Sequence, residues 1–299
     1  MKTIQKPLRQ RGVTLIEMMV GLSIGLLVVA VALGALMVSR GISGTVSDAS
    51  GIQQQGAYIL RVIGQQLRQT GSLYLNPDPA GGGTSTDVLS PVAFEIKADP
   101  VSGGNSFDQL STLAGASDTV TTGFRRYADN VFMVAGTEAA ASTPATFGTD
   151  YLARNCVGAP GNSSADQRVE SNFAFDSTKN ELRCGGNGAT AQAIAQNVAQ
   201  FLVTYLVQTV DVGTGTTVKY VKGSDIATVI DDPTKWRLVQ GVQVCLVLYG
   251  SEPIDMPAGS SYTDCDGNSV NMTTLSGGRK NRMHLLLRNT FQLRSQGLI

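Results

Sequence analysis

The sequence is poor in the side chains that carry most enzyme chemistry. Its 299 residues include one His, His284, and one Trp, Trp236. His284 falls on an alternating, strand-like run, where a lone imidazole is far more often structural than catalytic. No H-E-x-x-H, Walker A or G-x-S-x-G motif occurs, and no Ser-His-Asp triad is recognisable by local motif. We therefore predict no enzymatic activity, no catalytic residue, no metal site and no cofactor.

Charge is also scarce, and the two signs balance. Charged residues make up 15% of the chain and the formal net charge is zero, whereas about a quarter of an average globular domain is charged. A neutral chain has no bulk attraction for nucleic acid, whose binding depends on Lys and Arg. The pair Arg125 and Arg126 is more typical of a solvated edge than of a DNA groove. We predict no specific nucleic-acid partner.

The chain lacks C-x-x-C pairs, which argues against zinc ribbons and thioredoxin-like chemistry. Its four cysteines all lie in the second half, at Cys156, Cys184, Cys245 and Cys265. Four cysteines allow three pairings. We favour Cys156–Cys184 and Cys245–Cys265 because these disulfides close short loops. Four buried free thiols are the alternative, and export to an oxidising compartment disfavours them.

A basic N-terminus precedes a long stretch without charge. The first twelve residues carry Lys2, Lys6, Arg9 and Arg11 and no acidic residue, and positions 18–38 are 21 uncharged residues. A helix of that length spans a bilayer. Because basic flanks stay on the cytoplasmic side, the rest of the chain is predicted to lie on the other side of the membrane.

One carboxylate, Glu17, lies at the start of the apolar stretch. A charged side chain at the bilayer centre costs about 2.5–3.5 kcal/mol on insertion scales, so we expect a compensating group. If the chain is cut after Gly12, the new positive amine of Val13 is close to Glu17 in sequence. In an assembly, the amine could also come from a neighbouring subunit. Such an ion pair fixes how the two helices align as much as it stabilises their association.

The segment RGVTLIE at positions 11–17 resembles the class III signal of type IV pilins and type II secretion pseudopilins. In that family a prepilin peptidase cuts after the Gly and methylates the new N-terminal residue, and a Glu at the fifth mature position guides assembly. The resemblance implies cleavage between Gly12 and Val13, N-methylation of Val13 and an assembly role for Glu17. The family usually has Phe at the position of Val13. A plain signal anchor and a signal peptide cut near residues 30–32 are the alternatives.

A polar helix is predicted to continue the apolar one to about residue 70. One apolar stripe recurs at spacings of seven, four and four, at Ile52, Ile59, Ile63 and Leu67. Gly71 offers a C-terminal stop. The glycines at 41, 44, 51 and 56 predict bends or a short break. We expect a leader at 1–12, a membrane and assembly helix at 13–70 and a periplasmic or extracellular, β-rich globular domain at 71–299.

The globular part begins after a linker at residues 76–86, and its short β-like runs alternate with Gly, Ser and Asp clusters. We predict an early strand pair (118–126 with 130–134), followed by a long loop (136–166) and a short alanine-rich helix (189–200). A hairpin (201–207 with 217–221) and two later strands (242–249 and 283–293) complete the domain. Alternation in the last strand predicts a sheet with one buried face, and His284 on the other face. The fold class is α+β, a long pilin-type helix followed by a mainly antiparallel β-sheet domain with long loops.

Residues 193–295 contain Asn197-Val198 before a strand ending near Tyr205, a glycine hairpin, Trp236 before a Val-rich strand, and a final strand near Leu287-Arg288-Asn289. This order resembles the PilW-like minor pilins of type IV pili and, more distantly, the J-type pseudopilin of type II secretion. Members often have an acidic D-x-D-G-like turn after the Tyr. Here Asp211 stands alone among small residues, so we do not predict calcium binding there.

This resemblance implies a minor pilin that helps prime pilus assembly at or near the fibre tip. Its partners would be a prepilin peptidase, other minor and major pilins through the N-terminal helix, and the inner membrane. An adhesin at the tip is a further candidate partner. The protein would lie in the inner membrane with its C-terminal domain in the periplasm, and later in a fibre on the cell surface. A J-type pseudopilin and a membrane-anchored periplasmic enzyme are the alternatives.

Overall fold

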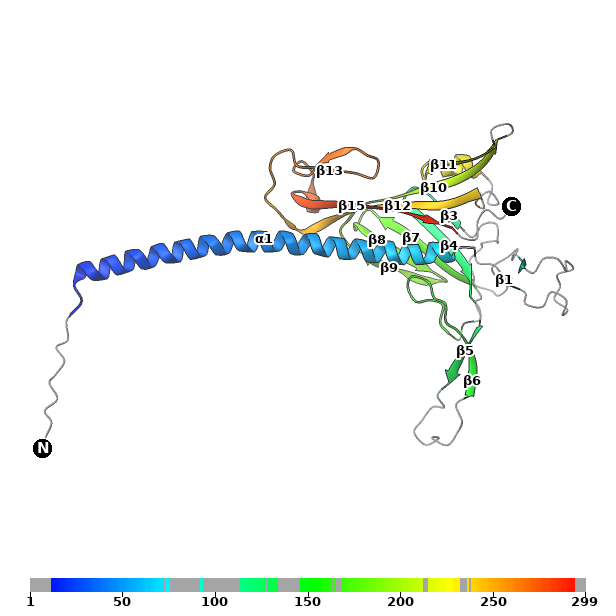
Figure 1. Cartoon of the computed structure of the whole chain (residues 1–299), viewed down its shortest axis with the longest axis horizontal. Helices are drawn as coiled ribbons and strands as arrows, with labels where there is room; N and C mark the ends of the chain where they lie inside the picture. Colours follow the sequence, from blue (N-terminus) through cyan, green and yellow to red (C-terminus); the bar gives the residue numbers. More distant parts are fainter. Residues whose placement is uncertain are drawn as a thin grey trace. The chain divides into compact units, whose positions relative to one another are not determined.

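Figure 1 shows a computed structural model of the chain. It describes residues 12–71, 74–75, 92–93, 113–126, 128–133, 146–162, 164, 168–211, 215–231, 236 and 238–293. The expected leader at 1–11 and linker at 76–86 lie outside the described residues. The chain divides into two compact units, Met1–Ala49 and Ser50–Ile299.

The first element is the 55-residue helix α1 (Leu15–Gln69), which contributes to both units. The helix is continuous from Leu15 to Gln69, so the expected short break is absent from this range. Gly71 ends the helix with a left-handed φ of 69°, and its amide donates to the Gly123 carbonyl at 3.0 Å. The predicted glycine stop is therefore confirmed, since glycine adopts this conformation without steric cost.

The stripe on the second half of α1 is buried, as the spacing predicted. Ile52 is 4% exposed, and Ile59, Ile63 and Leu67 are fully buried in the main core. Gly56 and Gly64 lie on the same side of the helix, where an added Cβ would meet Leu287 and Phe291 respectively. Glycine at these two positions lets the helix backbone approach the last strand closely.

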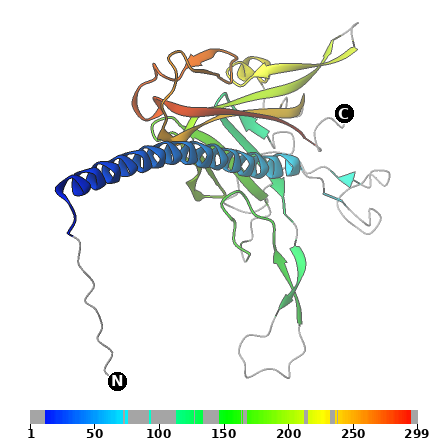
Figure 2. The same ribbon diagram turned by 60° about the vertical axis from the view of Figure 1, so that its left-hand side comes forward.

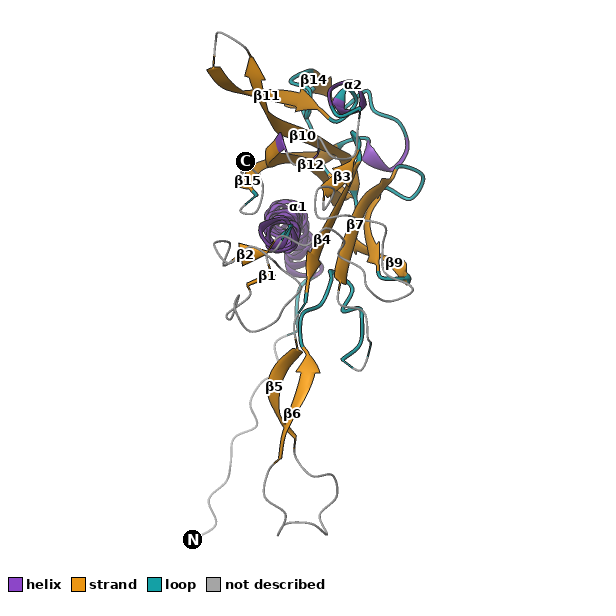
Figure 3. Ribbon diagram, turned by 90° about the vertical axis from the view of Figure 1, so that its right-hand side faces the viewer, coloured by secondary structure: helices purple, strands orange, loops and turns teal. Residues whose placement is uncertain are grey.

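One antiparallel sheet covers this stripe. Its strands are β10 (Val198–Asp211), β11 (Gly215–Lys222), β12 (Val239–Pro253) and β15 (Arg282–Gln292), in the order β11-β10-β12-β15. The predicted hairpin of β10 with β11 and the two later strands are confirmed. A short helix, α2 (Ile226–Val229), follows β11. In Figure 3, β10, β12 and β15 pass on one side of the end of α1.

The second antiparallel sheet passes beside the same end of the helix in Figure 3. It consists of β3 (Leu113–Gly115), β4 (Thr119–Arg125), β7 (Arg168–Asp176), β8 (Glu181–Gly186) and β9 (Ala189–Ala195), in the order β3-β4-β7-β8-β9. Tyr205 of β10 links the two sheets, because its hydroxyl lies 3.3 Å from the carbonyl of Thr119 in β4. Its ring also packs edge-on against Trp236, with the ring centroids 5.3 Å apart.

Two predictions about this region are wrong. The early strands do not pair with each other, because β4 pairs with β7, about fifty residues later. The strand after it, β5 (Ala128–Met133), pairs with β6 (Thr146–Tyr151), which lies inside the expected loop at 136–166. Another two-stranded sheet joins β1 (Tyr74–Leu75) to β2 (Val92–Ala93).

The alanine-rich segment at 189–200 is not a helix. It forms β9, and then β10 begins at Val198 after a bend at Asn197 with a φ of 56°. The turn before β9 contains Asn187, also with positive φ, and leads the chain back along β8. Alanine favours helix only as a weak local preference, and ladder hydrogen bonds to β8 override it here.

The prediction of a sheet with one buried face is also wrong. The segment between β12 and β15 carries a hairpin of β13 (Ser261–Thr263) and β14 (Ser269–Asn271) and a 3-10 turn, η4 (Gly277–Arg279). Figures 1 and 2 show this segment, in orange, against β15. It covers a second cluster on the outer face, made of Cys245, Val247, Cys265, Ala199, Leu202, Tyr262 and Leu286.

Candidate functional site

The chain enters α1 through a side-chain cap at Thr14. Gly12 and Val13 precede the helix without regular structure, and Val13 is 72% exposed. The Glu17 amide donates to the Thr14 hydroxyl at 3.3 Å, and the Met18 amide donates to the Thr14 carbonyl at 3.2 Å. Thr14 is thus the N-cap, and Glu17 holds the third helical position, where a capping box places an acid. This role of Thr14 was not predicted, although T-x-x-E is a recognisable signal for a helix N-terminus.

Glu17 lies at the positive end of the helix dipole, which favours a negative charge there. The Thr14 hydroxyl lies 3.5 Å from its carboxylate, a long and weak contact. The carboxylate forms no ion pair with any described residue.

The helix beyond Glu17 is apolar on every side. Leu15–Met37 is 23 residues long and apolar enough to cross a membrane, and none of it is buried within the chain. At 1.5 Å per residue it is about 35 Å long, and a bilayer core is about 30 Å thick. Its large apolar side chains are 49–76% exposed. A helix that is hydrophobic all round is stable only inside a membrane or a bundle of other helices.

Both favoured disulfides are present in the structure. Cys156–Cys184 ties the loop after β6 to β8, and Cys245–Cys265 ties β12 to the turn between β13 and β14. All four cysteines are paired. The second bond fixes the cover over the outer face of the first sheet.

Arg126 is not on a solvated edge, contrary to the expectation. It is 1% exposed, and its guanidinium donates to the carbonyls of Gly161 at 3.2 Å and Ser164 at 2.7 Å. The same group lies 4.7 Å from the centroid of the Tyr151 ring. The carbonyls and the Tyr151 ring replace the water molecules that would hydrate an exposed guanidinium. Arg126 therefore holds the loop after β6 in place.

His284 has a structural environment. It is 7% exposed, its ring stacks on Tyr262 with centroids 4.4 Å apart, and its Nδ1–H donates to the Arg282 carbonyl at 2.9 Å. Burial lowers the pKa of the imidazole. Among the described residues, no three His, Cys, Asp or Glu side chains gather to hold a metal ion.

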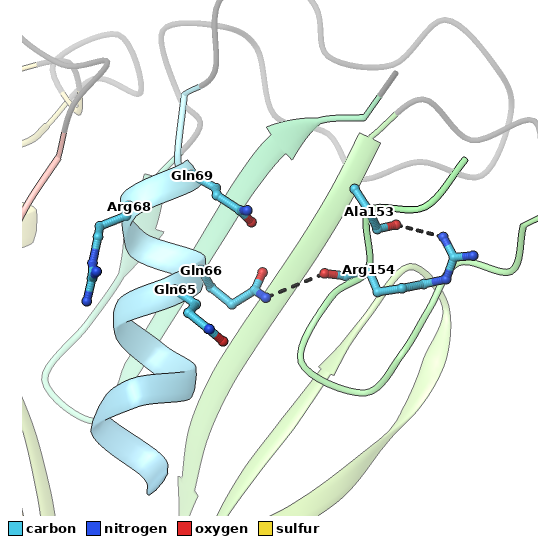
Figure 4. Close-up of a pocket in the computed structure, with 6 residues that line it drawn as sticks. All are labelled: Gln65, Gln66, Arg68, Gln69, Ala153 and Arg154. Carbon is cyan, nitrogen blue, oxygen red and sulfur yellow. Dashed lines mark hydrogen bonds between the residues drawn. The ribbon is translucent and has the colours of Figure 1, made fainter. Parts of the chain in front are cut away.

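An open depression of about 490 Å³ lies beside the last turns of α1. It is lined by Gln65, Gln66, Arg68, Gln69, Ala153 and Arg154 (Figure 4). Gln66 is fixed there, because its Oε1 accepts from Ser171 at 2.9 Å and its Nε2 donates to the Arg154 carbonyl at 3.5 Å. Among the described residues that line the depression there is no acid and no nucleophilic side chain.

Comparison with known proteins assigns both ends of the chain. Residues 170–295 match the family model described as type IV pilus-assembly protein W, and residues 7–33 match the prokaryotic N-terminal methylation motif. No curated protein sequence matches the chain. A solved structure, the type IV-like pilin TTHA1219 from Thermus thermophilus, is 14% identical, with a TM-score of 0.33, over 82% of this chain and 98% of that chain.

A methylation motif at the start of a long apolar helix, followed by antiparallel sheets, defines a type IV pilin-like protein. Within that class, residues 170–295 resemble the PilW family of type IV pilus-assembly proteins.

Proposed function

We propose that this chain is a structural subunit, a minor pilin that helps prime assembly of a type IV pilus at or near the fibre tip. The observation that carries the proposal is the methylation motif at 7–33, which leads directly into the exposed apolar helix of a chain that resembles the PilW family at residues 170–295. The chain itself catalyses no reaction. A prepilin peptidase cleaves it between Gly12 and Val13 and methylates the Val13 amine.

The short segment before α1 suits this cleavage. Gly12, Val13 and Thr14 have no regular structure and are exposed, so a peptidase can bind their backbone in an extended form. Helix begins at Leu15, which keeps the cut just outside it. Gly12 has open space around the position of an added Cβ. A demand for glycine there would therefore come from the peptidase and not from this chain's own packing.

After cleavage, the apolar half of α1 holds the subunit in the inner membrane and the β domain lies in the periplasm. On assembly, Glu17 pairs with the positive N-terminus of a neighbouring pilin, and apolar helices pack together in the fibre core. The carboxylate stays buried there only if a cation meets it, because an unpaired charge in a low dielectric is costly. Packing supplies cohesion and Glu17 sets the register. Other minor and major pilins, and a tip adhesin, are the partners.

Intact-mass and N-terminal analysis of the protein from its native membrane tests the cleavage. The wild-type chain is expected to begin at N-methylated Val13. Gly12→Val should leave a chain beginning at Met1, whereas the matched change Gly21→Val, at an exposed helix glycine, should be processed normally. A normal mature mass for Gly12→Val would refute the assignment, and a wild-type chain beginning at Met1 would indicate a simple anchored protein.

A further inference from the structure

The half of α1 that packs on the sheets also presents a free face. Five exposed residues lie along it at spacings of four, three, four and three, namely Gln54, Tyr58, Arg61, Gln65 and Arg68. We call this row the helix seam. Residues three and four apart line one side of a helix, so the five residues form one continuous row. Tyr58 is 58% exposed at its centre.

The helix seam carries charge of one sign. Arg61 and Arg68 are the only charged residues in positions 50–69. Neither forms an ion pair or a side-chain hydrogen bond within the described chain. The positions four residues before and after Arg61 are Ala57 and Gln65, so the helix supplies no acidic neighbour of its own. Protein surfaces usually mix the two signs, and this one does not.

The open depression adjoins the end of the helix seam. Gln65 and Arg68 belong to both, and Figure 4 shows the side chains of Gln65, Gln66 and Gln69 on the helix side nearest Ala153. Arg68 points to the other side of the helix in Figure 4, so the depression mainly offers amide groups, and the described residues that line it include no acid.

We propose that the helix seam docks an acidic helix of a different pilin-type subunit, an inference that rests on the function proposed above. Arg61 and Arg68 are seven residues apart, or about 10.5 Å along the axis. Asp or Glu side chains seven residues apart on a partner helix match that separation. A guanidinium holds a carboxylate with two parallel hydrogen bonds, and an exposed Tyr is a common interface anchor.

A second copy of this chain does not fit the same surface. Face to face, two seams would bring arginine against arginine, and like charges across an interface are strongly unfavourable. The partner is therefore a different subunit, and its docking face carries the opposite charge. If Arg61 and Arg68 were only solvated surface residues, association with another subunit would not depend on their charge.

Site-specific photo-cross-linking of the full chain in its native membrane tests this inference. A photoreactive phenylalanine derivative replaces Tyr58, and the cross-linked partner peptide is sequenced by mass spectrometry. We expect a helical segment of another pilin-type chain with Asp or Glu seven residues apart. Arg61→Glu with Arg68→Glu should lower the yield about tenfold, and Glu→Arg changes in the partner should restore it. Salt at about 1 M, where the screening length is about 3 Å, should lower the wild-type yield.

The matched control is Lys179→Glu with Lys280→Glu, which makes the same change in charge at exposed positions away from the helix seam. It should leave the yield unchanged. Arg61→Gln with Arg68→Gln removes the charge more gently and should give an intermediate loss. Equal yields in all variants, cross-links to a second copy, or no cross-link from a chain that reaches the fibre would overturn the inference. Intact mass from the same sample reports processing at Val13 separately, so failure of the proposed function is distinguishable.

Discussion

At the scale of single residues, His284 shows how a covered sheet face changes a side chain's chemistry. Its ring lies between Tyr262, at 4.4 Å, and Tyr249, at 5.8 Å, and Nε2 is buried without a hydrogen-bond partner. Burial lowers its pKa, the positive charge of Arg279 lowers it too, and the hydrogen bond to Arg282 opposes both. The folded state therefore prefers the neutral ring.

This preference predicts a loss of stability in acid. The unfolded chain binds a proton near pH 6.5, but the folded chain does so only at a lower pH. The stabilisation from the neutral ring is thus complete above about pH 6.5 and is lost as the pH falls below that value. Urea unfolding of the full chain at pH 5 to 8 measures it, with His284→Phe as the comparison. His284 is the only His, so identical pH dependence in the two proteins would contradict this account.

At the scale of elements, the long regular patterns were predictable and the pairings across the chain were not. The stripe from Ile52 to Leu67 and the alternation of β12 and β15 are local patterns, and they predicted these elements correctly. The pairing of β4 with β7, and the strand conformation of β9, depend on partners that no local window contains. The cover over His284 was not predicted, although the Cys245–Cys265 pairing that fixes it was.

The contact of α1 with β15 makes a matched pair of glycine substitutions informative. In Gly64→Ala the new methyl group would collide with the Phe291 ring, a rigid and buried neighbour. Overpacking costs about 1–3 kcal/mol, and the better helix propensity of Ala returns about 1 kcal/mol. We expect a net loss of about 1 kcal/mol in the free energy of unfolding, measured in urea.

Gly51→Ala is the control for that substitution. Gly51 lies in the same helix with nothing within 4 Å of an added Cβ. The same chemical change should stabilise the protein there by about 0.5–1 kcal/mol. Equal effects at the two positions would show that Phe291 does not pack against the helix as described.

At the scale of the whole molecule, the candidate processing site was the part most open to prediction from sequence. Gly12, Val13 and Glu17 lie within six residues, so their spacing needs no knowledge of the fold. Arg126 shows the opposite case, because its carbonyl partners lie 34 to 38 residues further along the chain. The helix seam could be recognised only after the structure showed which face of α1 the sheets cover.

The proposed role of Glu17 belongs to this scale, because it needs more than one subunit. Glu17→Ala should still begin at Val13 after processing but enter fibres at least tenfold less, since the neighbour's amine loses its partner. Quantitative immunoblotting of sheared fibres and membranes measures the ratio. Glu252→Ala, at an exposed carboxylate of the β domain, is the control. Wild-type incorporation of Glu17→Ala would remove the proposed role.

The burial of Ile59 and Ile63 beneath strands more than 130 residues later in the chain also constrains the order of folding. Phe291, which meets the helix at Gly64, is made more than 220 residues after it. Contacts so far apart in sequence form slowly, because a long loop must close first. The stripe on α1 therefore stays partly uncovered until these later strands have been made, and during that interval it is open to chaperones and to premature association.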